Sequence, residues 1–195
     1  VVRLGDLIEP VINGFDCREF TEVGTPYIRV GDIKKGRIDF GGAEKVGVQV
    51  SDVAKDISIE VGDVLFTRKG SYGNAAHVRD GQAQAIISSE IMRLHRRPEW
   101  REKILPEYLS MYLNSIAGAY QAEKWAHGVA FYSISQEDLA NFEITLLPLE
   151  QQADIRRLLD DSESARRRAH ALLERAKRTV EVAIEESESA ALKML

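Results

Sequence analysis

Residues 149–195 contain neither glycine nor proline and are rich in alanine, leucine, glutamate and arginine. This composition favours one α-helix along the whole segment. At about 1.5 Å per residue such a helix extends roughly 70 Å, which is too long to pack along one small domain. Because a narrow apolar stripe adjoins a densely charged face, the pattern predicts a coiled-coil arm that pairs with a second helix.

The apolar stripe of this arm follows the three- and four-residue spacing of one helix face. Its members are Ile155, Leu159, Ala169, Leu173, Ala176 and Val180. The alanines favour a close approach of the second helix, and its orientation stays open. The arginine-rich face is either solvated or docks an acidic partner surface. A helical hairpin is the alternative, with residues 160–164 as its weakest point, although no helix breaker is present there.

The first 147 residues have a different character, with short β-rich runs separated by glycine-containing turns. The predicted strands are residues 27–30, 57–59, 64–66, 85–94 and 142–147. Pro106 favours the start of a helix over 106–121, and Ser135 with Asp138 forms a capping box before a short helix. The sequence therefore predicts an α/β (α+β) chain, with a mainly β globular domain over 1–147 and a long helical arm over 148–195.

Charge and cysteine content limit the class of protein. The net charge of −5 and pI near 5.5 argue against a nucleic-acid partner unless basic residues cluster locally. The single cysteine, Cys17, cannot form an internal disulfide, and the histidines lack metal-ligand spacing. No apolar run reaches the roughly 18 residues of a membrane helix, and the start lacks an export signal. We expect a cytoplasmic protein without membrane contact.

Motifs for catalysis are absent from the sequence. It has no P-loop, and no Pro-Pro pair of the kind found in methyltransferases that modify exocyclic amines. The two glycines Gly70 and Gly73 are too closely spaced to make a phosphate-binding loop. One alternative is a small metal-dependent nuclease that uses Glu60, Asp63 and Lys69. We otherwise expect no catalytic residue, no metal and no cofactor.

Three predicted loops combine cations with aromatic and hydrogen-bonding residues. They carry Lys34, Lys35 and Arg37; Arg68, Lys69, Ser71, Tyr72 and Asn74; and Lys124, His127 and Tyr132, beside Trp125 and Phe131. Such side chains supply both phosphate contacts and base readout in DNA. We predict phosphate anchoring by Lys34, Lys35 and Lys69, and base reading by Arg68, Ser71, Tyr72, Asn74, Lys124 and His127. The alternative is that these loops are ordinary turns with solvated charges.

The order of the segments resembles the target-recognition domain of the specificity (S) subunit of type I restriction-modification systems. The resemblance rests on VRLGDL at 2–7, GTPYIRVGDI at 24–33, GDVLFTRKG at 62–70 and LPLEQQ at 147–152. It covers nearly the whole chain in order, and the combination of the last two segments is its most specific part.

This resemblance implies a non-catalytic protein that reads double-stranded DNA. Family members hold DNA adenine methyltransferase subunits, and in the full complex a restriction subunit, at the site that they recognise. A full-length S subunit has two recognition domains separated by long helices, and each domain reads one half of a bipartite site. Because this chain has one domain and one arm, the resemblance leaves the second half-site unexplained.

Several assemblies are consistent with one domain and one arm. We favour a half-subunit that forms a homodimer through its helices, since twofold symmetry suits a palindromic bipartite site. The alternatives are a fragment of a longer subunit and the recognition part of a fused methyltransferase-nuclease chain. A hypothesis of another class is a coiled-coil adaptor that binds protein rather than DNA, which the acidic pI supports.

Overall fold

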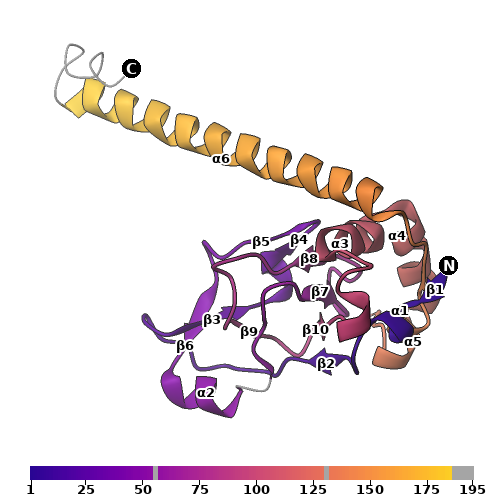
Figure 1. Ribbon diagram of the computed structural model, residues 1–195. Helices are drawn as coiled ribbons and strands as arrows, with labels where there is room; N and C mark the ends of the chain where they lie inside the picture. The colour runs from indigo at the N-terminus through magenta and orange to yellow at the C-terminus, as the bar shows by residue number, and fades with distance from the viewer. Residues whose placement is uncertain (55–56, 130–131, 186–195) are drawn as a thin grey trace. The chain divides into compact units, whose positions relative to one another are not determined.

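The computed structural model describes residues 1–54, 57–129 and 132–185. The chain divides into two compact units, Val1–Ala153 and Asp154–Leu195, which we describe separately. The strands and short helices of the described chain belong to the first unit, and most of the long helix α6 (Leu149–Glu185) belongs to the second (Figure 1). This organisation confirms the predicted mixed α/β fold with a β-rich domain and a long C-terminal helix.

The largest sheet of the described chain has four antiparallel strands in the order β2-β10-β7-β8. Its strands are β2 (Ile12–Asn13), β7 (Val64–Thr67), β8 (Ala75–His77) and β10 (Ile91–Leu94). All residues of β7 and β8 are buried, which explains why both strands lack the polar alternation of a half-exposed strand. The register places Phe66 between Ala75 on one neighbouring strand and Met92 on the other.

Shorter strands surround this sheet. The second sheet, β6-β3-β9, pairs β3 with β6 antiparallel and with β9 in parallel. A short hairpin joins β4 to β5, and β1 pairs antiparallel with β11. The bounds are β1 (Val2–Arg3), β3 (Thr25–Ile28), β4 (Ile33–Lys34), β5 (Arg37–Ile38), β6 (Glu44–Val46), β9 (Ile86–Ile87) and β11 (Glu143–Ile144).

One hydrophobic cluster joins the sheets into a common core. It includes Ile28 from β3, Leu65 from β7, Ala76 from β8, Ile87 from β9 and Ile91 from β10, all fully buried. Because each strand is short, burial of such residues rather than long hydrogen-bonded ladders stabilises the first unit.

The helices of the first unit are short, and two of them differ from the prediction. They are α1 (Leu4–Leu7), α2 (Val48–Val53), α3 (Pro106–Asn114), α4 (Ile116–Trp125) and α5 (Gln136–Ala140), with 3₁₀ turns at Val30–Asp32 and Pro98–Trp100. The predicted single helix over 106–121 is wrong, because Ser115 ends α3 and caps α4 by accepting a hydrogen bond from Gly118 N–H. A Cβ at Gly118 would lie 2.2 Å from Leu113 O, so the two helices meet closely there. The capping box of α5 is confirmed.

Three predicted strands also require correction. Residues 57–59 form no strand, although Ile59 hydrogen bonds with the backbone of residues 84 and 85. The run over 85–94 forms two strands, β9 and β10, which belong to different sheets. Only Glu143–Ile144 of the predicted strand over 142–147 pairs with another strand, because its partner β1 is itself two residues long.

Helix α6 extends over Leu149–Glu185, and the predicted continuation over 186–195 lies outside the described residues. Ion pairs one turn apart, Arg157–Asp154, Arg166–Glu163 and Lys177–Glu174, occur along it. None of the helices in the described chain is long and apolar enough to span a membrane.

Candidate nucleic-acid interface

The loop between β7 and β8, residues 68–74, is closed by the side chain of Thr67. Its hydroxyl donates to Ser71 O at 2.7 Å and accepts from Asn74 N–H at 3.0 Å. Gly70 and Gly73 adopt φ values of 66° and 84°, which favour glycine. The loop therefore turns tightly while its polar side chains stay accessible. Lys69 and Ser71 are exposed, and Arg68, Tyr72 and Asn74 are half-buried.

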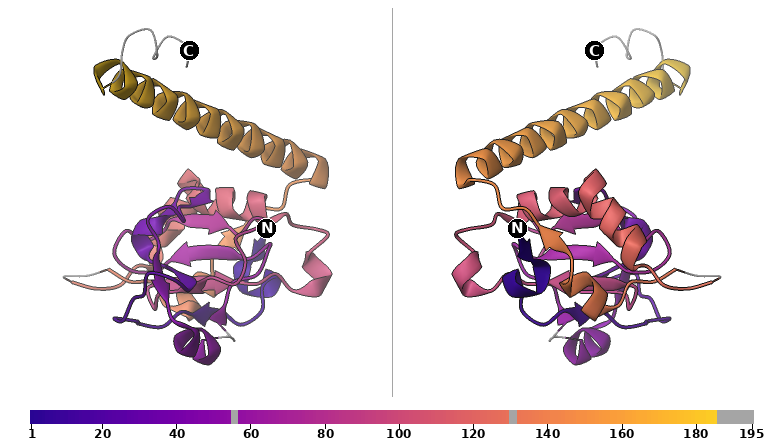
Figure 2. Two further views of the ribbon diagram at one scale, coloured as in Figure 1. Left: turned by 90° about the vertical axis from the view of Figure 1, so that its left-hand side faces the viewer. Right: turned by 90° about the vertical axis from the view of Figure 1, so that its right-hand side faces the viewer.

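The described residues of 127–133 lie directly beside this loop. Lys69 forms a β-bridge with Ser133, which also exchanges backbone hydrogen bonds of 2.8 and 2.9 Å with His127. The rings of Tyr72 and Tyr132 lie 6.2 Å apart between centroids. In Figure 2 this segment projects from the β-rich body of the first unit. The structure thus brings His127 and Tyr132 to the 68–74 loop, while Phe131 lies outside the described residues.

The turn between β4 and β5 joins the same surface through Ala75, the residue that follows the loop. Gly36 N–H donates to Ala75 O at 2.8 Å. From the other side, Asn114 Oδ1 accepts from Ala75 N–H at 3.0 Å and Asn114 Nδ2 donates to Ala75 O at 2.7 Å. Lys34 and Lys35 on this turn are exposed. We call residues 34–37, 68–74, 127–129 and 132–133 the three-loop surface.

The cations of the three-loop surface differ in the hydrogen bonds and ion pairs that they form within the protein. Arg37 forms an ion pair with Asp39 at 3.4 Å, and the pKa of Asp39 is lowered by a backbone N–H and further by Arg37. Arg68 Nε donates to a backbone carbonyl at 3.3 Å, which holds the side chain against the neighbouring segment. The ammonium of Lys69 has no hydrogen bond or ion pair within the described part of the chain. Lys69 is therefore the freest cation of the 68–74 loop.

Lys124 does not join this surface. It lines a hollow of about 520 Å³ together with Arg3, Tyr112 and Tyr120, and its ammonium lies 5.2 Å from the centre of the Trp125 ring. The preceding α4 residues face a different hollow, beside the 68–74 loop. The predicted placement of Lys124 in one loop with His127 is wrong, because Lys124 lies on α4. Its predicted role in base reading stays a prediction.

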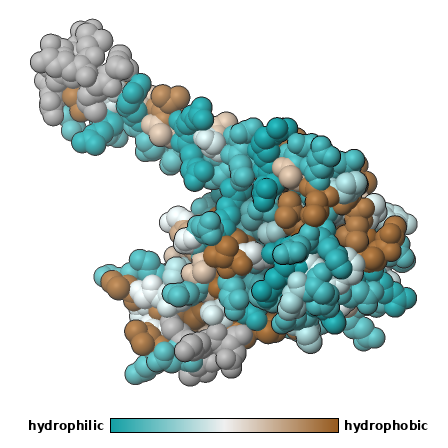
Figure 3. All heavy atoms as spheres, in the orientation of Figure 1, coloured by the Kyte–Doolittle hydropathy of each residue, from teal (hydrophilic) through white to brown (hydrophobic). Residues whose placement is uncertain are grey.

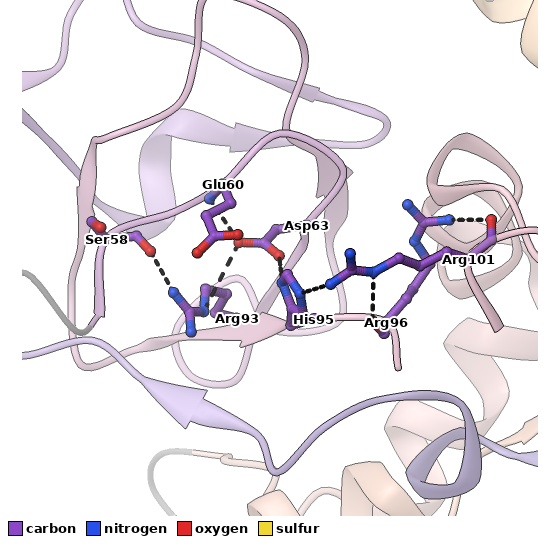
Figure 4. A network of polar contacts seen from close by, with 7 residues as sticks. All are labelled: Ser58, Glu60, Asp63, Arg93, His95, Arg96 and Arg101. Atoms are coloured by element: carbon purple, nitrogen blue, oxygen red, sulfur yellow. Dashed lines mark hydrogen bonds and ion pairs between the residues drawn. The ribbon is translucent and has the colours of Figure 1, made fainter. Parts of the chain in front are cut away.

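At the opposite end of β7, Asp63 is the centre of a buried polar network (Figure 4). Its carboxylate accepts from Glu60 N–H at 2.8 Å and from His95 Nδ1–H at 2.6 Å, and Arg93 Nε lies 3.9 Å away. Arg101 Nη2 donates to His95 Nε2 at 2.7 Å, which requires the neutral Nδ1–H tautomer of that ring.

This network does not support the nuclease alternative. Asp63 is fully buried, and Lys69 follows the other end of β7, a four-residue strand that is about 13 Å long at about 3.3 Å per residue. Within the described residues, no group of three or more histidine, cysteine or carboxylate side chains is placed to hold a metal ion. Asp63 instead accepts the Glu60 N–H and stabilises the turn before β7.

The ionisation of Asp63 predicts a pH-dependent stability. Burial raises its pKa, and this effect outweighs the lowering by the Glu60 N–H, His95 and Arg93. A raised pKa in the folded state means that stability falls as the pH rises through that pKa. We expect the free energy of unfolding of the native chain, relative to Asp63→Asn, to decrease between pH 4 and pH 7. Urea titrations of both proteins across this pH range measure the two free energies of unfolding. A difference between them that does not change with pH contradicts the prediction.

On α6, the predicted helix-pairing residues form part of a wider apolar face. Leu173 and Val180 are 54% and 58% exposed, and Ala169 and Ala176 are also exposed, whereas Ile155 and Leu159 are half-buried. Leu158, Leu172 and Ile184 are exposed too. At about 100° per residue, these side chains fall within an arc of roughly 140°. Figure 3 shows apolar residues interspersed among hydrophilic ones along the helix.

The sequence reasoning missed three polar residues that the structure makes important: Asn114, Glu123 and Gln152. Asn114 holds Ala75, Glu123 faces the 68–74 loop, and Gln152 is the one fully buried residue described in α6. The sequence signal for Asn114 is a polar residue on the same helix face as the buried residues of α3. No local pattern distinguishes Glu123 from the other charged residues of its helix.

Comparison with known proteins identifies relatives over most of the chain. Residues 1–174 match the family described as "Type I restriction modification DNA specificity domain". A putative type I restriction enzyme MjaX specificity subunit from Methanocaldococcus jannaschii is 28% identical over 172 residues, covering 83% of this chain and 38% of the relative. The type I restriction enzyme EcoBI specificity subunit from Escherichia coli is 26% identical over 137 residues, which cover 70% of this chain and 28% of the relative.

Solved structures share the fold. The S subunit of a type I restriction-modification system from M. genitalium superimposes with a TM-score of 0.65 at 17% identity, covering 98% of this chain and 47% of that chain. The HsdS subunit from Thermoanaerobacter tengcongensis superimposes with a TM-score of 0.57 at 23% identity. The match covers 94% of this chain and 46% of that chain. The chain therefore spans less than two fifths of these curated relatives and less than half of these solved chains.

Proposed function

Because the chain belongs to the family of type I restriction modification DNA specificity domains, we propose that it reads a DNA sequence through the three-loop surface. The observation that carries this proposal is the meeting of three loops that are separate in sequence. Gly36 of the 34–37 turn binds Ala75 at the end of the 68–74 loop, and Ser133 pairs with Lys69 of the same loop. Together they present cations for phosphates and polar side chains for base edges. The proposed recognition domain is 1–147, and the proposed arm is 148–195.

In this proposal the chain has no catalytic role of its own. It directs DNA adenine methyltransferase subunits, and in a complete system a restriction subunit, to a site on double-stranded DNA in the cytoplasm. No metal or cofactor is needed for this reading. The charged face of α6 offers arginines to an acidic surface of such partners, among them Arg168, Arg175 and Arg178, all exposed.

We further propose that two copies pair through the apolar face of α6. One recognition domain reads one half-site, so a twofold dimer reads a palindromic bipartite site, with the paired helices between its halves. The exposed leucines and valine of α6 support this pairing, because a solvated single helix gains nothing from an apolar face.

Salt dependence of DNA binding tests the function and separates it from the adaptor hypothesis. Each phosphate contact releases condensed counterions, so log affinity falls linearly with log salt, by about 0.9 per contact on B-DNA. We expect Lys34→Ala with Lys69→Ala in this chain to weaken binding to random-sequence duplex DNA and to reduce the slope of log affinity against log salt by about 2. Fluorescence anisotropy at several salt concentrations provides the measurement.

The matched control is Lys45→Ala with Lys103→Ala, which removes the same charge outside the three-loop surface. This control should keep the slope of the native chain. Equal effects of the two pairs would show only a general charge effect and would contradict the interface. A native chain that binds duplex DNA with no salt dependence would favour the adaptor.

A further inference from the structure

A hollow of about 310 Å³ lies at the base of the three-loop surface, between the 68–74 loop and α4. Its lining consists of Lys35, Tyr72, Gly73, Asn74, Asn114, Ala119, Ala122 and Glu123. The loop comes close to the helix here, since a Cβ at Gly73 would lie 3.3 Å from the Ala122 Cβ. Glu123, next to Ala122, is thereby held beside the loop.

The two amide side chains of this lining are already engaged by the protein. Asn114 binds both backbone groups of Ala75, and Asn74 Nδ2 donates to Ser71 O at 3.0 Å. In contrast, the Lys35 ammonium and the Glu123 carboxylate are exposed and have no hydrogen bond or ion pair within the described residues. The hollow therefore offers one free cationic donor and one free anionic acceptor.

A carboxylate on a DNA-binding surface is unfavourable for phosphate contact, because it repels the backbone. Its use is base readout: a glutamate accepts a hydrogen bond from the N4 amino group of cytosine in the major groove. Thymine O4 and guanine O6 and N7 are acceptors, so a carboxylate discriminates against them. A lysine has the complementary preference and donates to guanine O6 or N7. The major-groove edge of one cytosine-guanine pair presents both patterns side by side.

We propose that Glu123 and Lys35 read one cytosine-guanine pair in each half-site, with Glu123 accepting from cytosine N4 and Lys35 donating to guanine. This inference rests on the proposed DNA-reading function and adds two specificity-determining residues to it. It also changes the role of Lys35 from phosphate anchor to base contact. Asn114 acts as a positioning residue, because it fixes Ala75 and with it the end of the 68–74 loop.

Selection of bound sequences from randomised duplex DNA, followed by sequencing of the bound fraction, tests this inference with the 195-residue chain. We expect the native chain to enrich a site with a fixed cytosine-guanine pair. Glu123→Gln keeps the side-chain shape but supplies an amide, which pairs with adenine N6 and N7. This variant should lose about tenfold or more of the cytosine preference at that position and shift it toward adenine.

The matched control is Glu60→Gln, which removes the same charge at the opposite end of β7 and should keep the native preference. Lys35→Ala should weaken the preference for the same base pair. Melting temperatures equal to that of the native chain establish that the variants fold. If Glu123→Gln binds DNA with the native preference at every position, the inference is wrong while the proposed function stands. If the native chain enriches no sequence and its binding has no salt dependence, both are wrong.

Discussion

Replacing Gln152 with glutamate is expected to lower the free energy of unfolding of the first unit by about 3 kcal/mol or more at neutral pH. The Gln152 side chain is fully buried and binds three backbone groups. Its Oε1 accepts from Leu105 N–H at 2.8 Å, and its Nε2 donates to Lys103 O at 3.0 Å and Leu147 O at 2.8 Å. A carboxylate retains the acceptor, loses both donors and faces two carbonyl oxygens.

The sign of the pH dependence identifies the cause. A buried glutamate facing carbonyl oxygens has a folded-state pKa raised above its value of about 4.3 in the unfolded chain. The loss of stability is therefore smaller near pH 4, where the carboxyl group keeps one donor, and grows as the pH rises through the folded-state pKa. Urea unfolding followed by circular dichroism measures the free energy of unfolding of the native chain and of the variant at pH 4.5 and at pH 7.

Gln151→Glu provides the matched control, because Gln151 is the exposed neighbour of Gln152 in the same turn of α6. It adds the same charge to the helix without burying it, and surface changes of this kind usually stay within about 0.5 kcal/mol. Equal stability of the two glutamate variants at pH 7 would show that the three hydrogen bonds of Gln152 contribute little to the folded state.

Gln152 also shows where prediction from sequence stops. Its place in LPLEQQ predicts the start of a helix, and α6 begins at Leu149. Two of its hydrogen-bond partners, Lys103 and Leu105, lie almost 50 residues earlier in the chain. Helical periodicity describes one face of one element, so it cannot show which distant backbone groups meet that face.

The elements that the sequence predicts correctly depend on local patterns, whereas the missed ones depend on contacts between separate parts of the structure. Strand β7, the capping box of α5 and the helical arm depend on neighbouring residues, and the local pattern predicts each of them. The break at Ser115 depends on the close approach of Gly118 to Leu113, which no composition signal reveals. Likewise, the meeting of Lys35 with the 68–74 loop depends on hydrogen bonds to Ala75.

Leu173→Asp is expected to dissociate the proposed homodimer. Leu173 lies on the apolar face of α6 and is 54% exposed in the described chain. Burying a leucine side chain contributes about 2 kcal/mol, and twofold symmetry applies the loss twice, for about 4 kcal/mol in total. Since about 1.4 kcal/mol corresponds to a factor of ten, the dimer dissociation constant should rise by about 1000-fold. Sedimentation equilibrium over a range of concentrations measures this change.

The control for this variant lies two residues away on the same helix. Ala171 is exposed and points about 160° away from Leu173 at 100° per residue, so Ala171→Asp adds the same charge to the opposite face. Both substitutions lower helix propensity by similar amounts, so only the apolar contact differs between them. The proposal requires that Ala171→Asp sediments like the native dimer while Leu173→Asp is monomeric. A native chain that is monomeric throughout, or two variants that dissociate equally, would show that α6 does not pair two copies through this face.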